Sequence, residues 1–317
     1  VNDEALALAQ VLGDPFFIAR AFNNNAFSRL HDLEHRRACL RQSAQIRRAI
    51  GDRGNLCFSL AQLTACLAEA GAFAEAEQVL EEAVRVQHEI GKTPVYIAVL
   101  VFRAQLAFWR GELDLAAELL QTGQAFAGGR IYTGFSYHYP ALLSWIAGVR
   151  GDYEQGYAFA QQLAGKPWAK TFFMVWRLGW GLALAHYGLG NAAAARQALH
   201  DVLALTRHTL QAPSVQQFCL PLAAVLAETP ERAVELLGLA DRAPKELTGW
   251  MAHWQPLIAL RQKLAAELGA EWYAAVWERG ARLALDTVVE QLLAELTRNP
   301  VVHWTTIQEE NLAADVQ

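Results

Sequence analysis

The sequence predicts an all-α protein: an α-solenoid of about six lengthened helix pairs, wound as a right-handed superhelix and closed by a C-terminal helical cap. Three observations predict this fold. Short turns headed by glycine recur at a nearly constant spacing. The segments between them carry apolar residues at the 3.6-residue period of an amphipathic helix. Other breaks, with glycine or proline, recur about halfway between these turns.

The glycine turns share a pattern. Each has a small residue five places after the glycine, and all but the last have a bulky or apolar residue two places after it. They begin at Gly71, Gly111, Gly151 and Gly190, which are 40, 40 and 39 residues apart. Glycine can take the left-handed conformation that ends a helix and reverses the chain. We therefore expect the small residues, such as Ala76, Ala116 and Ala195, at the closest approach of two paired helices. Weaker copies at 31–36 and 228–233 bring the total to six.

The first copy departs from the pattern, because His31 replaces the glycine and Arg36 replaces the small residue. The breaks between the glycine turns mark the starts of further helices, since proline is tolerated at the first helical position. They lie at 13–15, 51–52, 91–94 and 212–213. Each unit is thus predicted to be a helix, a tight turn, a second helix and a looser turn.

These breaks predict three parts. Residues 1–245 form the solenoid, and residues 2–12 fit the second helix of a repeat whose first helix is absent, so we expect the chain to be part of a longer protein. Residues 246–296 form two or three helices that cap the last repeat, because a solenoid end otherwise leaves its apolar face in water. Residues 297–317 form a tail, in which Thr306–Glu309 fits a capping box and predicts a short helix over 306–314.

Composition narrows the function. The net charge of −5 and pI near 6.0 argue against a nucleic-acid surface, which would carry a basic stripe. The four cysteines form no C-x-x-C pair and are read as buried thiols of a reducing compartment; they are Cys39, Cys57, Cys66 and Cys219. No apolar run approaches the ~18 residues of a membrane span, and no export signal opens the chain. We expect a cytoplasmic location and no membrane partner.

Two short motifs resemble chemical sites. The stretch from His31 to His35 satisfies the H-x-x-E-H pattern of inverted zinc proteases, but the repeat places His31 in a turn, off the continuous helix that zinc needs. Gly91-Lys92-Thr93 mimics the end of a phosphate loop, but it follows a predicted helix and Val86 stands where the loop needs glycine. We therefore predict that the first motif is a solvated turn and that the second is a linker between two helices. We also predict that the chain binds no metal and no cofactor. The sequence also contains no recognisable cluster of carboxylates that would indicate an enzyme.

A groove is the remaining candidate site. Counting back from each turn glycine places five residues where the first helix of a repeat usually faces a concave surface: Gln105, His138, Trp145, Arg177 and Trp180. Such a wall of aromatics, with one arginine, could bind an extended peptide or a small anionic effector. The alternative is that Trp145 and Trp180 fill the core between repeats, as aromatics at helical spacing usually do.

The turn pattern and its ~40-residue period resemble a lengthened tetratricopeptide repeat. The segment Gly13–Ala26 also resembles the first helix of the repeats in large bacterial ATP-dependent regulators, the signal-transduction ATPases with numerous domains that include LuxR-type and antibiotic-regulator-type activators. The segments Glu231–Ala240 and Leu268–Val288 are similar to the closing segment of the same proteins. The resemblance covers residues 3–296. It implies a non-catalytic sensor that receives a protein, peptide or small effector and controls upstream domains of the same polypeptide. The alternative is a stand-alone scaffold or peptide-binding adaptor.

Overall fold

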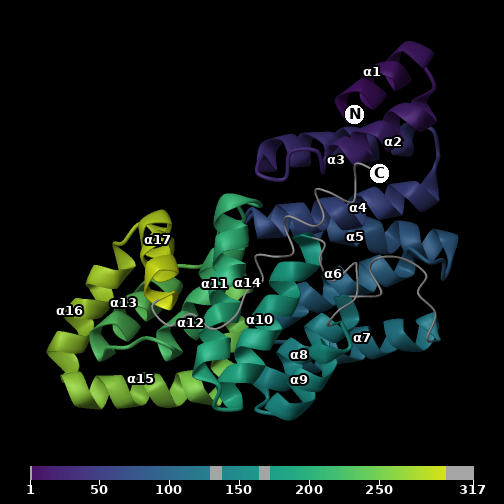
Figure 1. The fold of residues 1–317 in the computed structure, drawn as a ribbon. Helices are drawn as coiled ribbons and strands as arrows, with labels where there is room; N and C mark the ends of the chain where they lie inside the picture. Colours follow the sequence, from purple (N-terminus) through teal and green to yellow (C-terminus); the bar gives the residue numbers. More distant parts are fainter. Residues whose placement is uncertain (1, 129–137, 164–171, 298–317) are drawn as a thin grey trace. The chain divides into compact units, whose positions relative to one another are not determined.

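The computed structural model describes residues 2–128, 138–163 and 172–297 (Figure 1). Helix covers 82% of these residues, and they contain no strand. The prediction of an all-α protein built from neighbouring helix pairs is therefore confirmed. None of the described helices is both long enough and apolar enough to cross a membrane. The predicted helix over 306–314 lies outside the described residues.

The helices group into two compact units. Unit 1 combines residues 1–139 with two later segments, 206–218 and 243–250. Its helices follow in chain order as α1 (Asn2–Leu12), α2 (Pro15–Asn25), α3 (Leu33–Ala49), α4 (Arg53–Glu69), α5 (Phe73–Ile90), α6 (Tyr96–Trp109), α7 (Leu113–Ala127) and the short α14 (Lys245–Thr248). Each helix from α1 to α7 packs on the next one along the chain, as a succession of hairpins requires.

Unit 2 combines residues 140–205, 219–242 and 251–317. Its helices are α8 (His138–Val149), α9 (Tyr153–Gln161), α10 (Phe172–Gly188), α11 (Ala192–His208), α12 (Pro213–Val225), α13 (Pro230–Ala240), α15 (Gln255–Leu268), α16 (Ala270–Ala281) and α17 (Leu285–Leu296). The ends of α8, α11 and α12 fall in unit 1. The 3₁₀ helix η3 (Gly249–His253) begins in unit 1 and ends in unit 2. Within unit 2, α15 and α16 pack on α13, which is the last helix of the predicted solenoid.

All four predicted turns begin with a glycine in the left-handed region. The φ angles of Gly71, Gly111, Gly151 and Gly190 are 83°, 86°, 88° and 76°. A residue with a Cβ would be strained there, which explains why the pattern requires glycine. At the first turn, where no glycine is present, Asp32 starts α3 by accepting a hydrogen bond of 2.9 Å from the amide of His35.

The small residues after the turns lie in the interior, as predicted. Ala76, Ala116 and Ala195 are all buried. The exception at Arg36 is also buried, and its guanidinium lies 3.0 Å from Oε2 of Glu69, which is equally hidden. Burial works to lower the pKa of Arg36, but the charge of Glu69, the nearby Cys66 and the hydrogen bond to Glu69 together outweigh it, so that the pKa is raised. A large charged residue fits this position because α4 supplies the opposite charge.

Candidate partner-binding groove

Two of the five predicted groove residues belong to unit 1. Gln105 lies on α6 with 1% of its surface exposed, and His138 begins α8 with 5% exposed. The imidazole of His138 lies near the ring of Phe102, at a centroid distance of 6.3 Å. Both side chains are therefore interior, although both are polar.

The other three belong to unit 2, where α8 and α10 bring them together. The indole N–H of Trp145 donates a hydrogen bond of 2.7 Å to the carbonyl oxygen of Arg177. The ring of Trp145 lies 5.5 Å from Trp176 and 5.3 Å from Trp180, the latter edge to face. The guanidinium of Arg177 lies over the ring of Trp176, 4.3 Å from its centroid. The result is an aromatic cluster with a cation packed against it.

This cluster corrects the expectation that Trp145 and Trp180 face an open groove. Neither residue has any exposed surface, and Arg177 is only 1% exposed. The repeat period placed the two tryptophans correctly on one face of successive first helices, but that face is filled by the rings themselves. The core interpretation therefore holds for Trp145 and Trp180. The other three predicted groove residues, Gln105, His138 and Arg177, also lie in the interior.

The sequence did not indicate that α6 is covered by a distant segment of the chain. The indole of Trp250 stacks on Phe108, with ring centroids 6.2 Å apart and an interplanar angle of 17°. Phe218 completes the contact, at 5.3 Å from Trp250. The backbones also meet closely, because a Cβ on Gly249 would lie 2.0 Å from the carbonyl oxygen of Arg110. In unit 1, later residues of the chain thus cover the C-terminal end of α6.

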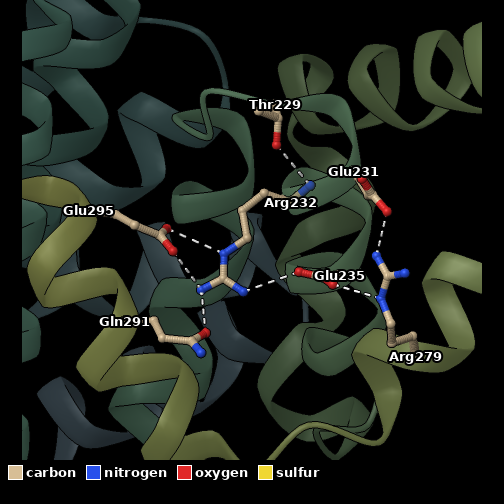
Figure 2. A network of polar contacts seen from close by, with 7 residues as sticks. All are labelled: Thr229, Glu231, Arg232, Glu235, Arg279, Gln291 and Glu295. Atoms are coloured by element: carbon tan, nitrogen blue, oxygen red, sulfur yellow. Dashed lines mark hydrogen bonds and ion pairs between the residues drawn. The ribbon is translucent and has the colours of Figure 1, made fainter.

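A polar network joins α13 to α16 and α17 (Figure 2). Arg232 of α13 contacts Glu295 and Gln291 of α17, with Nη2 3.0 Å from an oxygen of each. It also donates to Glu235 within its own helix, at 3.3 Å. Arg279 of α16 donates from Nε to Glu235 at 2.8 Å and from Nη2 to Glu231 at 2.7 Å, and these two hydrogen bonds raise its pKa. Arginines of one helix thus face carboxylates of a neighbouring helix, and this pairing of opposite charges is typical of a contact that holds helices together.

A second polar network lies inside the first helices of unit 1. Ser59 of α4 donates to Asn23 of α2 at 2.9 Å, and Arg47 of α3 donates to the hydroxyl of Ser59 at 2.5 Å. Ser43 donates to the backbone of α2 at the carbonyl of Ala19, at 2.8 Å. Burial lowers the pKa of Arg47. The two serine hydroxyls connect neighbouring helices through hydrogen bonds. They do not form a pair of nucleophile and general base.

The remaining motifs lie where the sequence predicted them. His31 lies in the turn before α3, and Gly91 starts the linker from α5 to α6. The four cysteines are buried free thiols. Across 2–128, 138–163 and 172–297, no group of three histidine, cysteine, aspartate or glutamate residues could hold a metal ion. A cavity of about 420 Å³ in unit 2 is lined by seven residues: Val149, Arg150, Gly151, Tyr153, Gln255, Pro256 and Ala259. Its lining contains no acid–base pair.

A comparison with protein-family models and with curated proteins finds no match.

Proposed function

We propose that this chain is a non-catalytic binding module of the lengthened tetratricopeptide type, with its helix pairs wound as a right-handed superhelix. The observation that carries the proposal is the repeated hairpin. A left-handed glycine recurs every 39 or 40 residues from Gly71 to Gly190, and a buried alanine follows three of these glycines five places later. Repeats of this kind that stack in succession create an extended concave surface, which suits such a chain to binding an extended partner.

In this proposal the module is the sensor of a larger bacterial ATP-dependent regulator. A protein, peptide or small effector binds one state of the helix array better than the other, and the difference in affinity shifts the activity of the upstream domains. A tenfold difference in affinity corresponds to about 1.4 kcal/mol of coupling, and this is within the usual range. In this mechanism, the buried aromatic cluster of unit 2 serves to pack the helices of that unit together.

The test is a measurement on the whole polypeptide that contains this module. Its rate of ATP hydrolysis should change when residues 1–317 are removed, because the module holds or releases the ATPase. An unchanged rate, with and without cell extract as a source of effector, would contradict a sensor role. A coding sequence without any phosphate loop would instead favour the alternative, a stand-alone scaffold or peptide-binding adaptor.

A further inference from the structure

Arg261 of α15 has hydrogen-bond donors that the protein does not satisfy. Its Nε and Nη2 atoms are buried and have no hydrogen-bond partner in the described part of the chain. Other arginines of unit 2 differ in this respect, since Arg196, Arg232 and Arg279 each contact a carboxylate. A buried donor without an acceptor lowers stability, and the loss is larger when the donor is charged. Stability alone would therefore favour an apolar residue at this position.

The side chains next to Arg261 are aromatic. Its guanidinium lies over the ring of Trp277 on α16, 5.4 Å from the centroid, and the ring of Tyr273 lies 5.7 Å from that of Trp277. These three residues, here called the Arg261 cluster, are half-buried and so form part of the surface of unit 2. Trp272, next to Tyr273 in the sequence, is exposed. Tryptophan, tyrosine and arginine are the residue types that contribute most to binding at protein interfaces.

The Arg261 cluster offers donors and positive charge. Burial raises the pKa of Tyr273, and the charge of Asp241 adds to this rise while that of Arg261 opposes it, so the hydroxyl keeps its proton at neutral pH. This hydroxyl forms no hydrogen bond with any of the described residues. Asp241 forms no ion pair with Arg261, and the next residue, Arg242, carries the opposite charge to Asp241. The cluster therefore lacks an acceptor, and a carboxylate is the acceptor that arginine binds most strongly.

Helix α13 holds the aromatic side of the cluster in place. A Cβ on Gly238 would lie 2.3 Å from the carbonyl oxygen of Trp277, and a Cβ on Gly280 would lie 2.2 Å from that of Glu235. The backbones of α13 and α16 therefore touch, and the ion pairs in Figure 2 join the same two helices. A surface that is already ordered costs less entropy when a partner binds to it.

We propose that the Arg261 cluster binds an acidic side chain of a protein partner. The partner's carboxylate pairs with Arg261 and accepts from the hydroxyl of Tyr273, and the apolar part of the partner packs against Trp277. Nη1 of Arg261 is not among the buried atoms without a partner, so it gives the carboxylate its point of access. This site is independent of the proposed sensor function, because a scaffold could use it equally well.

The first experiment selects partners from a displayed library of random short peptides. The wild-type chain is immobilised, and an excess of the Arg261→Gln variant in solution removes peptides that bind elsewhere on the protein. The retained peptides should share an aspartate or a glutamate. A selection that retains no peptide, or that retains peptides without an acidic residue, overturns the proposal.

The second experiment measures the affinity of a retained peptide by calorimetry. Replacing its acidic residue by the corresponding amide should weaken binding at least tenfold, and so should Arg261→Gln. The two changes together should add little, because both remove the same pair. Arg282→Gln is the matched control, since Arg282 is an exposed arginine paired with Glu278 and its loss should leave the affinity unchanged. Fully additive losses would mean that the acidic residue contacts another site, which would overturn the proposal.

A measurement of stability separates a binding residue from a structural one. Arg261→Met keeps an apolar stem against Trp277 and removes the unsatisfied donors, so the Tm should stay the same or rise. Arg232→Met is the comparison and should lower the Tm, because Arg232 contacts Glu295 and Gln291. Circular dichroism on heating gives both values. An equal fall in Tm for the two variants would show that Arg261 is structural and would contradict the proposal.

Discussion

Trp180 lies on α10 with no exposed surface, and its ring meets that of Trp145 edge to face at 5.3 Å. Aromatic residues in this arrangement stabilise a fold through buried area and through the pairing of their rings. At the scale of the residue, the side chain is therefore a structural one, and its removal should change stability before it changes binding.

Trp180→Ala should lower the free energy of unfolding by about 3–5 kcal/mol, because it leaves a large cavity in unit 2. Urea denaturation followed by circular dichroism measures the change. Trp272→Ala is the matched control, since Trp272 is 53% exposed and its loss should cost within about 0.5 kcal/mol. A small cost at Trp180 together with a clear loss of partner binding would restore the groove interpretation.

Because its thiols are buried, the free energy of unfolding of the protein should depend on pH in the alkaline range. Burial raises the pKa of Cys57 from 9.0 to about 12 and that of Cys66, where it again is the main cause, to about 11. The folded state thus holds protons that the unfolded chain releases above pH 9, so stability is full below pH 9 and falls as pH rises toward 11–12. Each thiol contributes a slope of about 1.4 kcal/mol per pH unit in that window.

The measurement is urea denaturation at pH 8 and at pH 10.5. Cys57→Ala should reduce the difference in unfolding free energy between the two pH values. Replacement of the exposed Ala193 by serine should leave that difference as it is. If Cys57→Ala did not alter the pH dependence, Cys57 would titrate normally and the assignment of its burial would be wrong.

At the scale of the element, the hairpin is the unit that the sequence specifies best. Its turn glycine and its small residue both act over fewer than ten residues, so the local sequence contains the information. Arg36 shows where local sequence is not sufficient. The turn pattern requires a small residue at this position, but the chain has a large arginine that forms a buried ion pair with Glu69. That pairing depends on a residue 33 positions away, which a local pattern does not reveal.

Ala195→Leu should destabilise the α10–α11 hairpin by about 1–3 kcal/mol, since the extra atoms have no room at the closest approach of the helices. Ala193→Leu lies two residues earlier on the exposed side of the same helix and should cost little. Thermal unfolding of the two variants gives the comparison. Equal effects would mean that the register of α11 against α10 is wrong.

Arg232→Met should cost about 1–3 kcal/mol, because Glu235 and Glu295 then lose a shared partner in a partly buried setting. The control is Arg282→Met. Arg282 forms an exposed pair with Glu278, and exposed pairs contribute almost nothing. Denaturation at low salt and at 1 M salt separates the two cases, and a loss at Arg232 that vanishes in salt would mean that the network of Figure 2 is a weak surface contact.

At the scale of the whole chain, the composition of unit 1 departs from that of a strictly linear solenoid. In such a solenoid each repeat contacts only its neighbours. Unit 1 instead includes residues 206–218 and 243–250, whose Phe218 and Trp250 pack against α6. The periodic pattern predicted each hairpin but not this return, because the pattern describes positions within a repeat and contains no information on which repeat a later segment meets.

Trp250→Ala should therefore expose α6 to exchange, although the two lie more than 130 residues apart in sequence. Removing the indole takes away the ring that stacks on Phe108, so amide hydrogen exchange over residues 96–109 should become faster. Trp254→Ala is the matched control: Trp254 is equally buried but belongs to unit 2, where its indole donates to Tyr153 at 3.3 Å and its ring meets Tyr187. That variant should speed exchange in α9 and α10 and leave α6 unchanged. A linear solenoid predicts the opposite for Trp250→Ala, with faster exchange only in α13 and α15, and this pattern would show that the contact between Trp250 and α6 contributes no stability.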